Sequence, residues 1–164
     1  MAQREHHYTA VIEWTGNKGQ GTTSYQAYER SYDVHVEGKP TLHGSSDPRF
    51  RGDPARYNPE DLLLAALSAC HMLWYLHLCA AAKVVVTAYR DRAEGFMTMN
   101  PDGSGQFTRV VLRPEVTISS GDPETARRLH HEASAKCFIA RSVNFPVEHE
   151  PTVRVETASA EAAG

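Results

Sequence analysis

One stretch constrains the fold more than any other: residues 62–82 are apolar on nearly every side of a helix and contain no glycine or proline. Just before them stand Asn58, Pro59, Glu60 and Asp61, which suit the capping residue, first position and first turn of a helix. We therefore predict a helix of about 24 residues, about 36 Å long. A helix that is apolar all round belongs in a core, so the remaining segments must cover this one.

The segments on both sides of this helix alternate as β-strands do. Three strands are predicted to open the chain, and the first two form a hairpin around a glycine-rich turn. After the helix, two further runs pair as a second hairpin region with a short strand between them, and one strand closes the chain. In order, the predicted strands are 8–14, 22–28, 32–36, 84–93, 96–99, 107–119 and 151–155.

A second helix is predicted over residues 126–137, because residues 121–124 repeat the chemistry of a helix start; residues 138–143 can continue it. Residues 44–57 form a long loop, which in a compact domain is usually functional or mobile. The order of elements predicts an α+β domain with antiparallel sheets around a long central helix. We expect one domain over residues 1–156 and a flexible tail over residues 157–164.

Charge and composition narrow the possible partners and location. The net charge is -3 and the pI is near 6.3, with no run of Lys or Arg. These values predict no nucleic-acid partner and no anionic membrane partner. The N-terminus lacks the apolar segment of a signal peptide, and no apolar stretch reaches about 18 residues. We expect a cytoplasmic protein.

The three cysteines are Cys70, Cys79 and Cys137, and in a reducing cytosol they start as thiols. Cys70 and Cys79 lie about 13.5 Å apart along one helix, too far for a disulfide. A buried, inert thiol is the default for each, and we accept it for Cys79. A reactive thiol would instead need a cation that favours the thiolate. Glu60, about 15 Å from Cys70 along the helix, could hold such a cation but could not touch the thiol.

Three segments resemble one protein family. Residues 57–71, from Tyr57 through Asn58, Pro59 and Glu60 to Cys70 and His71, look like the helix that leads to the reactive cysteine of the OsmC and organic hydroperoxide resistance proteins. Residues 135–140 resemble the segment around that family's second cysteine, and residues 14–22 resemble its first hairpin. The resemblance covers nearly all of residues 8–156.

The resemblance implies an OsmC-like fold, an intertwined homodimer with two active sites at its interface, and a cysteine-based peroxidase. Cys70 would attack an organic hydroperoxide, or in some members hydrogen peroxide, and become a sulfenic acid. Cys137 would resolve it as a disulfide, and a thiol or lipoyl-type dithiol would reduce that disulfide. Glu60 would position an arginine. The family requires no cofactor and no metal.

The sequence departs from the family in the position of the arginine. The family carries this arginine in the first glycine-rich turn. The matching turn offers only Lys18 and Gln20. We favour Arg51, because it lies in the loop just upstream of the helix. The other candidates are Arg30, Arg49 and Lys18.

The nine histidines provide a weaker signal. No pair has the i, i+4 spacing of a helical metal site, and Cys70 and His77 lie about 10.5 Å apart along the helix, so we predict no metal. A contribution of His71 or His77 to the thiol stays open. Met72, Trp74 and Tyr75 are either core or the apolar wall of a substrate site.

Two other functions stay open. The first is a non-catalytic or hydrophobic-ligand-binding member of the same fold, in which the displaced arginine leaves Cys70 unactivated. The second, weaker one is acyl transfer by a Cys–His pair, which needs an imidazole in reach of Cys70 and an oxyanion hole.

Overall fold

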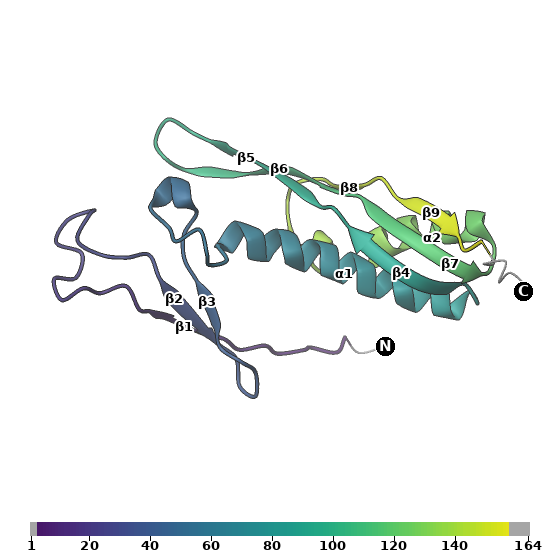
Figure 1. Cartoon of the computed structure of the whole chain (residues 1–164), viewed down its shortest axis with the longest axis horizontal. Helices are drawn as coiled ribbons and strands as arrows, with labels where there is room; N and C mark the ends of the chain where they lie inside the picture. The colour runs from purple at the N-terminus through teal and green to yellow at the C-terminus, as the bar shows by residue number, and fades with distance from the viewer. Residues whose placement is uncertain (1–2, 158–164) are drawn as a thin grey trace, which may run out of the picture. The chain divides into compact units, whose positions relative to one another are not determined.

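The computed structural model describes residues 3–157 (Figure 1). It contains two compact units, one ending at Leu63 and the other beginning at Leu64. The predicted single domain over residues 1–156 stays a prediction. Of the predicted tail 157–164, all but Thr157 lies outside the described residues.

The first unit holds an antiparallel sheet in the order β1-β2-β3. Its strands are β1 (Val11–Trp14), β2 (Tyr32–His35) and β3 (Leu42–Gly44). The strands predicted at 8–14 and 32–36 are confirmed with shifted ends, whereas the short β3 was not predicted.

The predicted hairpin between residues 8–14 and 22–28 is wrong. β1 pairs instead with β2, with Trp14 opposite Tyr32, and residues 22–28 form no strand. The Asn17 side chain accepts hydrogen bonds from the amides of Gly19 and Gly21, at 2.9 and 3.0 Å. These local bonds fold the segment into a loop in place of a strand ladder.

The loop predicted at 44–57 contains a 3₁₀ helix, Pro48–Phe50, capped by Asp47. Its amides are bonded: Arg51 donates to the Pro48 carbonyl and Gly52 donates to the Asp47 carbonyl, each at 3.1 Å. Arg51 has a left-handed backbone, with φ 64°, which closes the turn tightly.

The long helix is confirmed as α1, Pro59–Ala81. Asn58 Oδ1 accepts from the Asp61 amide at 2.8 Å, and Asp61 Oδ2 accepts from the Asn58 amide at 3.2 Å. This reciprocal cap fixes the start of the helix. Its buried residues recur every four positions and so form one stripe. They are Leu67, His71, Tyr75 and Cys79.

The second unit contains two three-stranded sheets, in the orders β4-β7-β9 and β5-β6-β8. The strands are β4 (Val85–Asp91), β5 (Glu94–Met99), β6 (Gly105–Leu112), β7 (Pro114–Ser120), β8 (Val147–His149) and β9 (Thr152–Val155). The predicted run 107–119 is therefore two strands, which separate at Arg113. β7 pairs with β4 as predicted, while β6 pairs with β5.

The expectation of purely antiparallel sheets is wrong for two strand pairs. β6–β8 and β7–β9 are parallel. The reason is the crossover through α2, Pro123–Lys136, after which the chain re-enters both sheets in the direction of β6 and β7. The short β8 was not predicted, whereas β9 was.

The helix α2 is confirmed, with Asp122 as its cap, accepting from the Thr125 amide at 2.8 Å. The backbone of Cys137 is extended and ends the helix. The predicted continuation over 138–143 is only a 3₁₀ turn, Ala140–Ser142. One core cluster joins α1, α2 and the sheet β4-β7-β9. Its largest members are Tyr75, Val116, Ile118 and Leu129.

By length and composition alone, α1 would also suit a membrane span, with 22% of its most apolar window buried. Core helices pass the same test, and Tyr75 and Cys79 of the buried stripe belong to the core cluster. Its other apolar residues include Leu73, which is 62% exposed. These residues leave α1 with apolar surface that the described residues do not cover. The predicted central position of this helix in a dimer stays a prediction.

The loop before α1 leads to a stability prediction. A Cβ at Gly52 would lie 1.5 Å from the Ser46 carbonyl oxygen, whereas a Cβ at Gly103 would meet nothing within 4 Å. In urea unfolding, we expect Gly52→Ala to cost roughly 2–3 kcal/mol and Gly103→Ala, with φ 87°, about 1 kcal/mol from backbone strain. Equal losses would contradict the close approach.

Candidate thiol site

The second unit brings two of the predicted site residues together. Cys70 lies in the middle of α1, and Cys137 caps the end of α2. Burial raises the pKa of the Cys137 thiol to about 11; a hydrogen bond from the Ala140 amide opposes this, and contact with the Cys70 thiol adds to it. The Ala140 amide lies 3.4 Å from Cys137 Sγ. The two thiols are therefore neighbours, although 67 positions separate them in sequence.

The three thiols differ in their access to solvent. Cys70 is partly exposed, whereas Cys79 and Cys137 are each 1% exposed. Burial also raises the pKa of Cys79, against a hydrogen bond with Tyr75 that lowers it. Cys79 is thus the buried, inert thiol that the sequence predicted. All three are free thiols.

An apolar groove lies beside the two thiols. It has a volume of about 300 Å³ and is lined by Leu73, Trp74, His77 and Phe138. Leu73 and Trp74 are three and four residues after Cys70 on α1, and Phe138 follows Cys137. The Trp74 and Phe138 rings pack edge to face, with centroids 5.5 Å apart. Trp74 is therefore a groove wall, while Tyr75 is core.

Glu60 lies in the first unit, in the first turn of α1. Its Oε2 atom is buried and has no hydrogen-bond partner among residues 3–157. Burial, and after it the charges of Glu60 and Asp61, raise the pKa of Tyr32, so the Tyr32 phenol lies close to this carboxylate. A buried carboxylate oxygen without a partner is costly, which suits a group that receives a donor when the site is complete.

Two of the predicted cations are already engaged within the first unit. Lys18 forms an ion pair with Glu29. The Arg30 guanidinium donates to the carbonyls of Tyr25 and Tyr28, each at 2.6 Å, and lies over both of their rings. Arg30 is thereby held in place by four contacts.

Arg49 and Arg51 are more exposed than Arg30. The Arg51 guanidinium lies 5.8 Å from the centre of the Tyr25 ring and helps to lower the pKa of Glu29, mainly an effect of Lys18. Neither Arg49 nor Arg51 forms an ion pair within 4.0 Å among the described residues, so both guanidinium groups keep donors available.

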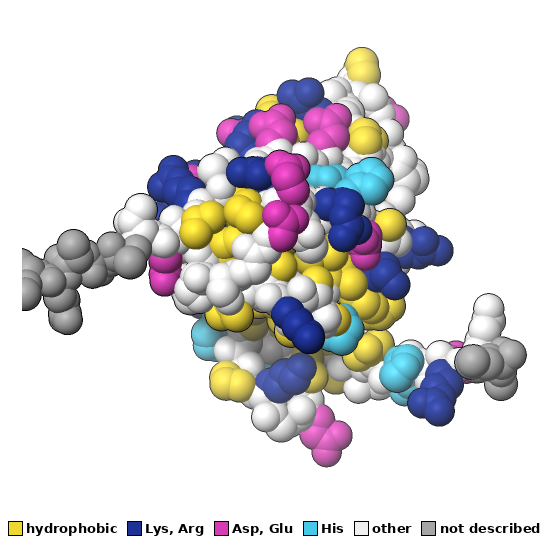
Figure 2. Space-filling model, turned by 90° about the vertical axis from the view of Figure 1, so that its right-hand side faces the viewer, with side chains coloured by type: hydrophobic (Ala, Val, Ile, Leu, Met, Phe, Trp, Pro, Cys, Tyr) yellow, Lys and Arg dark blue, Asp and Glu magenta, His cyan; other side chains and the backbone are white. Residues whose placement is uncertain are grey.

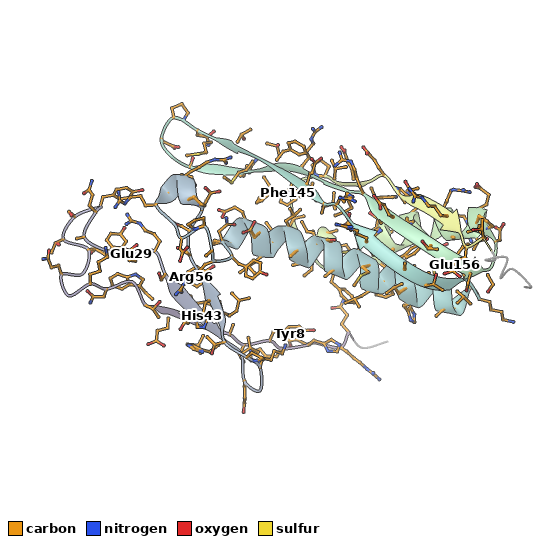
Figure 3. The ribbon with its side chains drawn as sticks, viewed as in Figure 1. Tyr8, Glu29, His43, Arg56, Phe145 and Glu156 are labelled. Atoms are coloured by element: carbon orange, nitrogen blue, oxygen red, sulfur yellow. The ribbon has the colours of Figure 1, made fainter. Side chains whose placement is uncertain are left out.

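Sequence reasoning missed Arg56, in the segment that leads from β3 to α1 (Figure 3). Its Nη1 atom is buried and has no hydrogen-bond partner in the described part of the chain, while Nε lies 3.6 Å from Asp53. The available signal was its position, four residues before Glu60. Buried donors are rarely left unpaired in proteins, so Arg56 joins Arg51 as a candidate.

The predicted site thus falls in two parts. Cys70 and Cys137 are neighbours in the second unit, whereas Glu60 and Arg51 belong to the first. The joint action of these four residues stays a prediction.

The two histidines left open by the sequence have different surroundings. His71 is buried and forms a hydrogen bond with His130, whereas His77 lines the apolar groove. Residues 3–157 contain no group of three or more His, Cys, Asp or Glu side chains placed to hold a metal ion. His77 is the histidine on the side of the thiols.

Paired thiols, one reachable and one buried, on the two helices of an α+β unit are typical of proteins that perform thiol redox chemistry. The family comparison is more specific: residues 52–152 match the OsmC-like protein family. The chain belongs to this family. Among curated proteins, none matches the sequence.

Solved structures agree with this assignment. The chain is similar to an OsmC-like protein of unknown function from Vibrio cholerae, with 32% identity over 90% of this chain and 100% of that one, and a TM-score of 0.81. It also has the fold of organic hydroperoxide resistance proteins from Legionella pneumophila and Elizabethkingia anophelis. Each of these is 16% identical, over 93% and 94% of this chain and 100% of theirs, with TM-scores of 0.64 and 0.65.

The exposure of the thiols predicts their labelling. At pH 7.5, we expect iodoacetamide to modify the reduced, folded protein once, at Cys70, and three times after unfolding in urea. Peptide mass mapping locates the adduct, and Cys70→Ser should take up none while folded. Labelling of Cys79 or Cys137 at a comparable rate would contradict the burial of those two thiols.

Proposed function

We propose that this protein is a thiol-dependent peroxidase that reduces organic hydroperoxides. Cys70 is the nucleophile, Cys137 is the resolving thiol, and Glu60 positions an arginine, Arg51 in the first instance. The observation that carries the proposal is the proximity of a partly exposed Cys70 to a buried Cys137. The fold shared with organic hydroperoxide resistance proteins supports it.

The proposed cycle conserves atoms and electrons in each step. The Cys70 thiolate attacks the outer peroxide oxygen; the O–O bond breaks, the alkoxide takes a proton and leaves as the alcohol, and Cys70 becomes a sulfenic acid. Cys137 then forms the S–S bond, and water leaves with the Cys137 proton. A thiol or lipoyl-type dithiol reduces the disulfide by exchange and is itself oxidised.

The environment of Cys137 suits the resolving step. Burial holds the pKa of Cys137 near 11, so its thiol stays protonated at pH 7. Cys137 therefore does not compete with Cys70 for peroxide, because the thiolate is the reactive form. It reacts only with a sulfenic acid formed next to it. A proton on Cys137 is also what the departing hydroxide needs.

The groove favours organic peroxides over hydrogen peroxide. Its lining is mainly apolar, and Leu73 and Phe138 are 62% and 66% exposed. An alkyl or aryl substituent placed there would bury apolar surface, at about 25 cal/mol per Å², whereas hydrogen peroxide has no such group.

The proposed partners are a second copy of the chain, a hydroperoxide, and the reductant. A homodimer would cover the apolar surface that α1 leaves exposed. Nucleic acid and membranes are not proposed partners, because the net charge is -3 and Figure 2 shows positive and negative side chains intermixed on one face. A reducing cytoplasm would keep the thiols ready to react.

Intact mass after oxidation tests the cycle. One equivalent of cumene hydroperoxide should lower the mass of the reduced protein by about 2 Da, with a disulfide between Cys70 and Cys137. Cys137→Ser should stop at a sulfenic acid, Cys70→Ser should not react, and Cys79→Ser should behave like the parent. Cumene hydroperoxide should react faster than hydrogen peroxide.

An unchanged mass would remove the peroxidase proposal. The alternative would then be a hydrophobic-ligand-binding member of the family, which the open apolar groove of about 300 Å³ favours. Quenching of Trp74 fluorescence by a fatty acid, with a matching loss in Phe138→Ala, would support that alternative.

The activating cation is tested by substitutions that each remove one charge. Arg51→Gln and Glu60→Gln should each slow oxidation of Cys70 by roughly 10- to 100-fold, since one charge-assisted hydrogen bond is worth about 1.5–3 kcal/mol. Stopped-flow measurements with cumene hydroperoxide give the rates. Arg56→Gln tests the alternative candidate for the cation. Arg49→Gln is the control for the loss of a positive charge from the same loop. A loss in Arg56→Gln with none in Arg51→Gln would transfer the role to Arg56.

A further inference from the structure

Four histidines form a continuous cluster inside the second unit. They lie on three elements: His71 on α1, His130 and His131 on α2, and His149 on β8. Successive ring centroids are 5.9 Å apart from His131 to His149, 5.7 Å from His149 to His71, and 5.4 Å from His71 to His130. The cluster therefore leads from an exposed histidine to the centre of the core.

The innermost two histidines join the two helices. His71 Nε2 lies 3.0 Å from His130 Nδ1, and the side chains are 1% and 0% exposed. The Tyr75 ring stacks on His130 with centroids 3.7 Å apart, and the Tyr75 hydroxyl donates to the Ala126 carbonyl of α2 at 3.0 Å. The contact between α1 and α2 thus includes a hydrogen bond between two imidazoles.

This hydrogen bond requires at least one neutral ring, because one nitrogen must donate and the other must accept. A first proton would place a charge in the core, and a second would leave two donors facing each other. His130 Nε2 and the Tyr89 hydroxyl of β4 are both buried and have no hydrogen-bond partner among the described residues. A proton on His130 Nε2 would therefore have no hydrogen-bond acceptor in reach among the described residues.

The charged groups around the pair also oppose protonation. Burial, then His149, lowers the pKa of His71 to about 4. Burial, then His71 and His149, lowers that of His130 to about 3. His149 is itself shifted down by burial and then by His131. No carboxylate contributes to these pKa values, so nothing compensates a buried positive charge.

We propose that the hydrogen bond between His71 and His130 is a pH-sensitive contact that holds α2 against α1 when both rings are neutral and releases α2 in acid. The sign follows from the proton balance. Once exposed, each ring takes up a proton near pH 6.5, whereas in the closed contact it does not until about pH 4 or 3. The contact is at full strength above pH 6.5 and weakens as the pH falls towards 4.

Release of α2 would act on the thiols, because Cys137 caps the C-terminal end of that helix. This consequence rests on the proposed function: in acid, Cys70 sulfenic acid would form but would be resolved more slowly. The contact itself does not depend on any activity.

Hydrogen exchange of the α2 amides in the reduced full chain tests the contact. After correction for the intrinsic exchange rate, the opening constant should rise between pH 7 and pH 5 by about 20-fold for each ring exposed by the opening. The double variant His71→Leu/His130→Phe removes both hydrogen-bonding partners, and its rise should be below about 2-fold. His131→Gln, on the exposed end of the cluster, should keep the full rise.

Nitrogen-15 spectra of the histidine rings keep the proposal testable if the double variant does not fold. In the parent protein, His71 and His130 should stay neutral down to pH 5. A parent opening constant that does not change with pH would overturn the proposal, as would a double variant that retains the rise. Titration of His130 near pH 6.5 without any change in α2 would do the same.

A second experiment measures the effect on the thiols and is independent of the hydrogen-exchange test. As a fraction of all oxidised Cys70, dimedone should trap more sulfenic acid at pH 5 than at pH 7 in the parent, but the same fraction at both pH values in the double variant. If no sulfenic acid forms at either pH, the proposed function fails, and the hydrogen-exchange result still decides the histidine contact.

Discussion

Burial of one stripe of α1 organises the larger unit. Leu67, His71, Tyr75 and Cys79 recur at helical spacing. Tyr75 and Cys79 enter the core formed with α2 and the sheet β4-β7-β9, and His71 is hydrogen-bonded to His130 of α2. Cys70 immediately precedes a stripe residue, so it lies at the margin of the stripe and is partly exposed. The same burial that stabilises the helix therefore sets how far the Cys70 thiol can reach solvent, because a shift of one residue along the helix would bury it.

The site depends on a difference between two chemically identical side chains. Cys137 is buried at the end of α2 and keeps its proton, whereas Cys70 is open to small reagents beside an apolar groove. Ordinary thiols differ little in reactivity, so the proposed function requires burial and neighbouring groups to distinguish the two cysteines. The contact between α1 and α2 brings the thiols together, and a pair of neutral imidazoles contributes to that contact.

The sequence predicted best what depends on local interactions. The starts of α1 and α2 were readable because Asn58 and Asp122 cap their own helices. Strand pairing depends on distant partners, so the sequence does not predict the parallel β6–β8 pair. For the same reason, residues 22–28 form a loop where a strand is predicted. The expectation that Cys70 and Cys137 act together came from the family resemblance and not from their spacing, and it stays a prediction. Arg56 had only its position four residues before Glu60 as a signal, because a buried donor without a partner becomes visible only in three dimensions.

The position of Cys137 has a mechanical consequence. A disulfide from Cys70 to Cys137 would close a loop that contains four strands, β4 to β7, and the whole of α2. Cross-linking a loop of this length removes chain entropy from the unfolded state worth about 4 kcal/mol. The oxidised chain would then resist unfolding and proteolysis more than the reduced chain. Oxidised molecules would therefore survive longer than reduced ones.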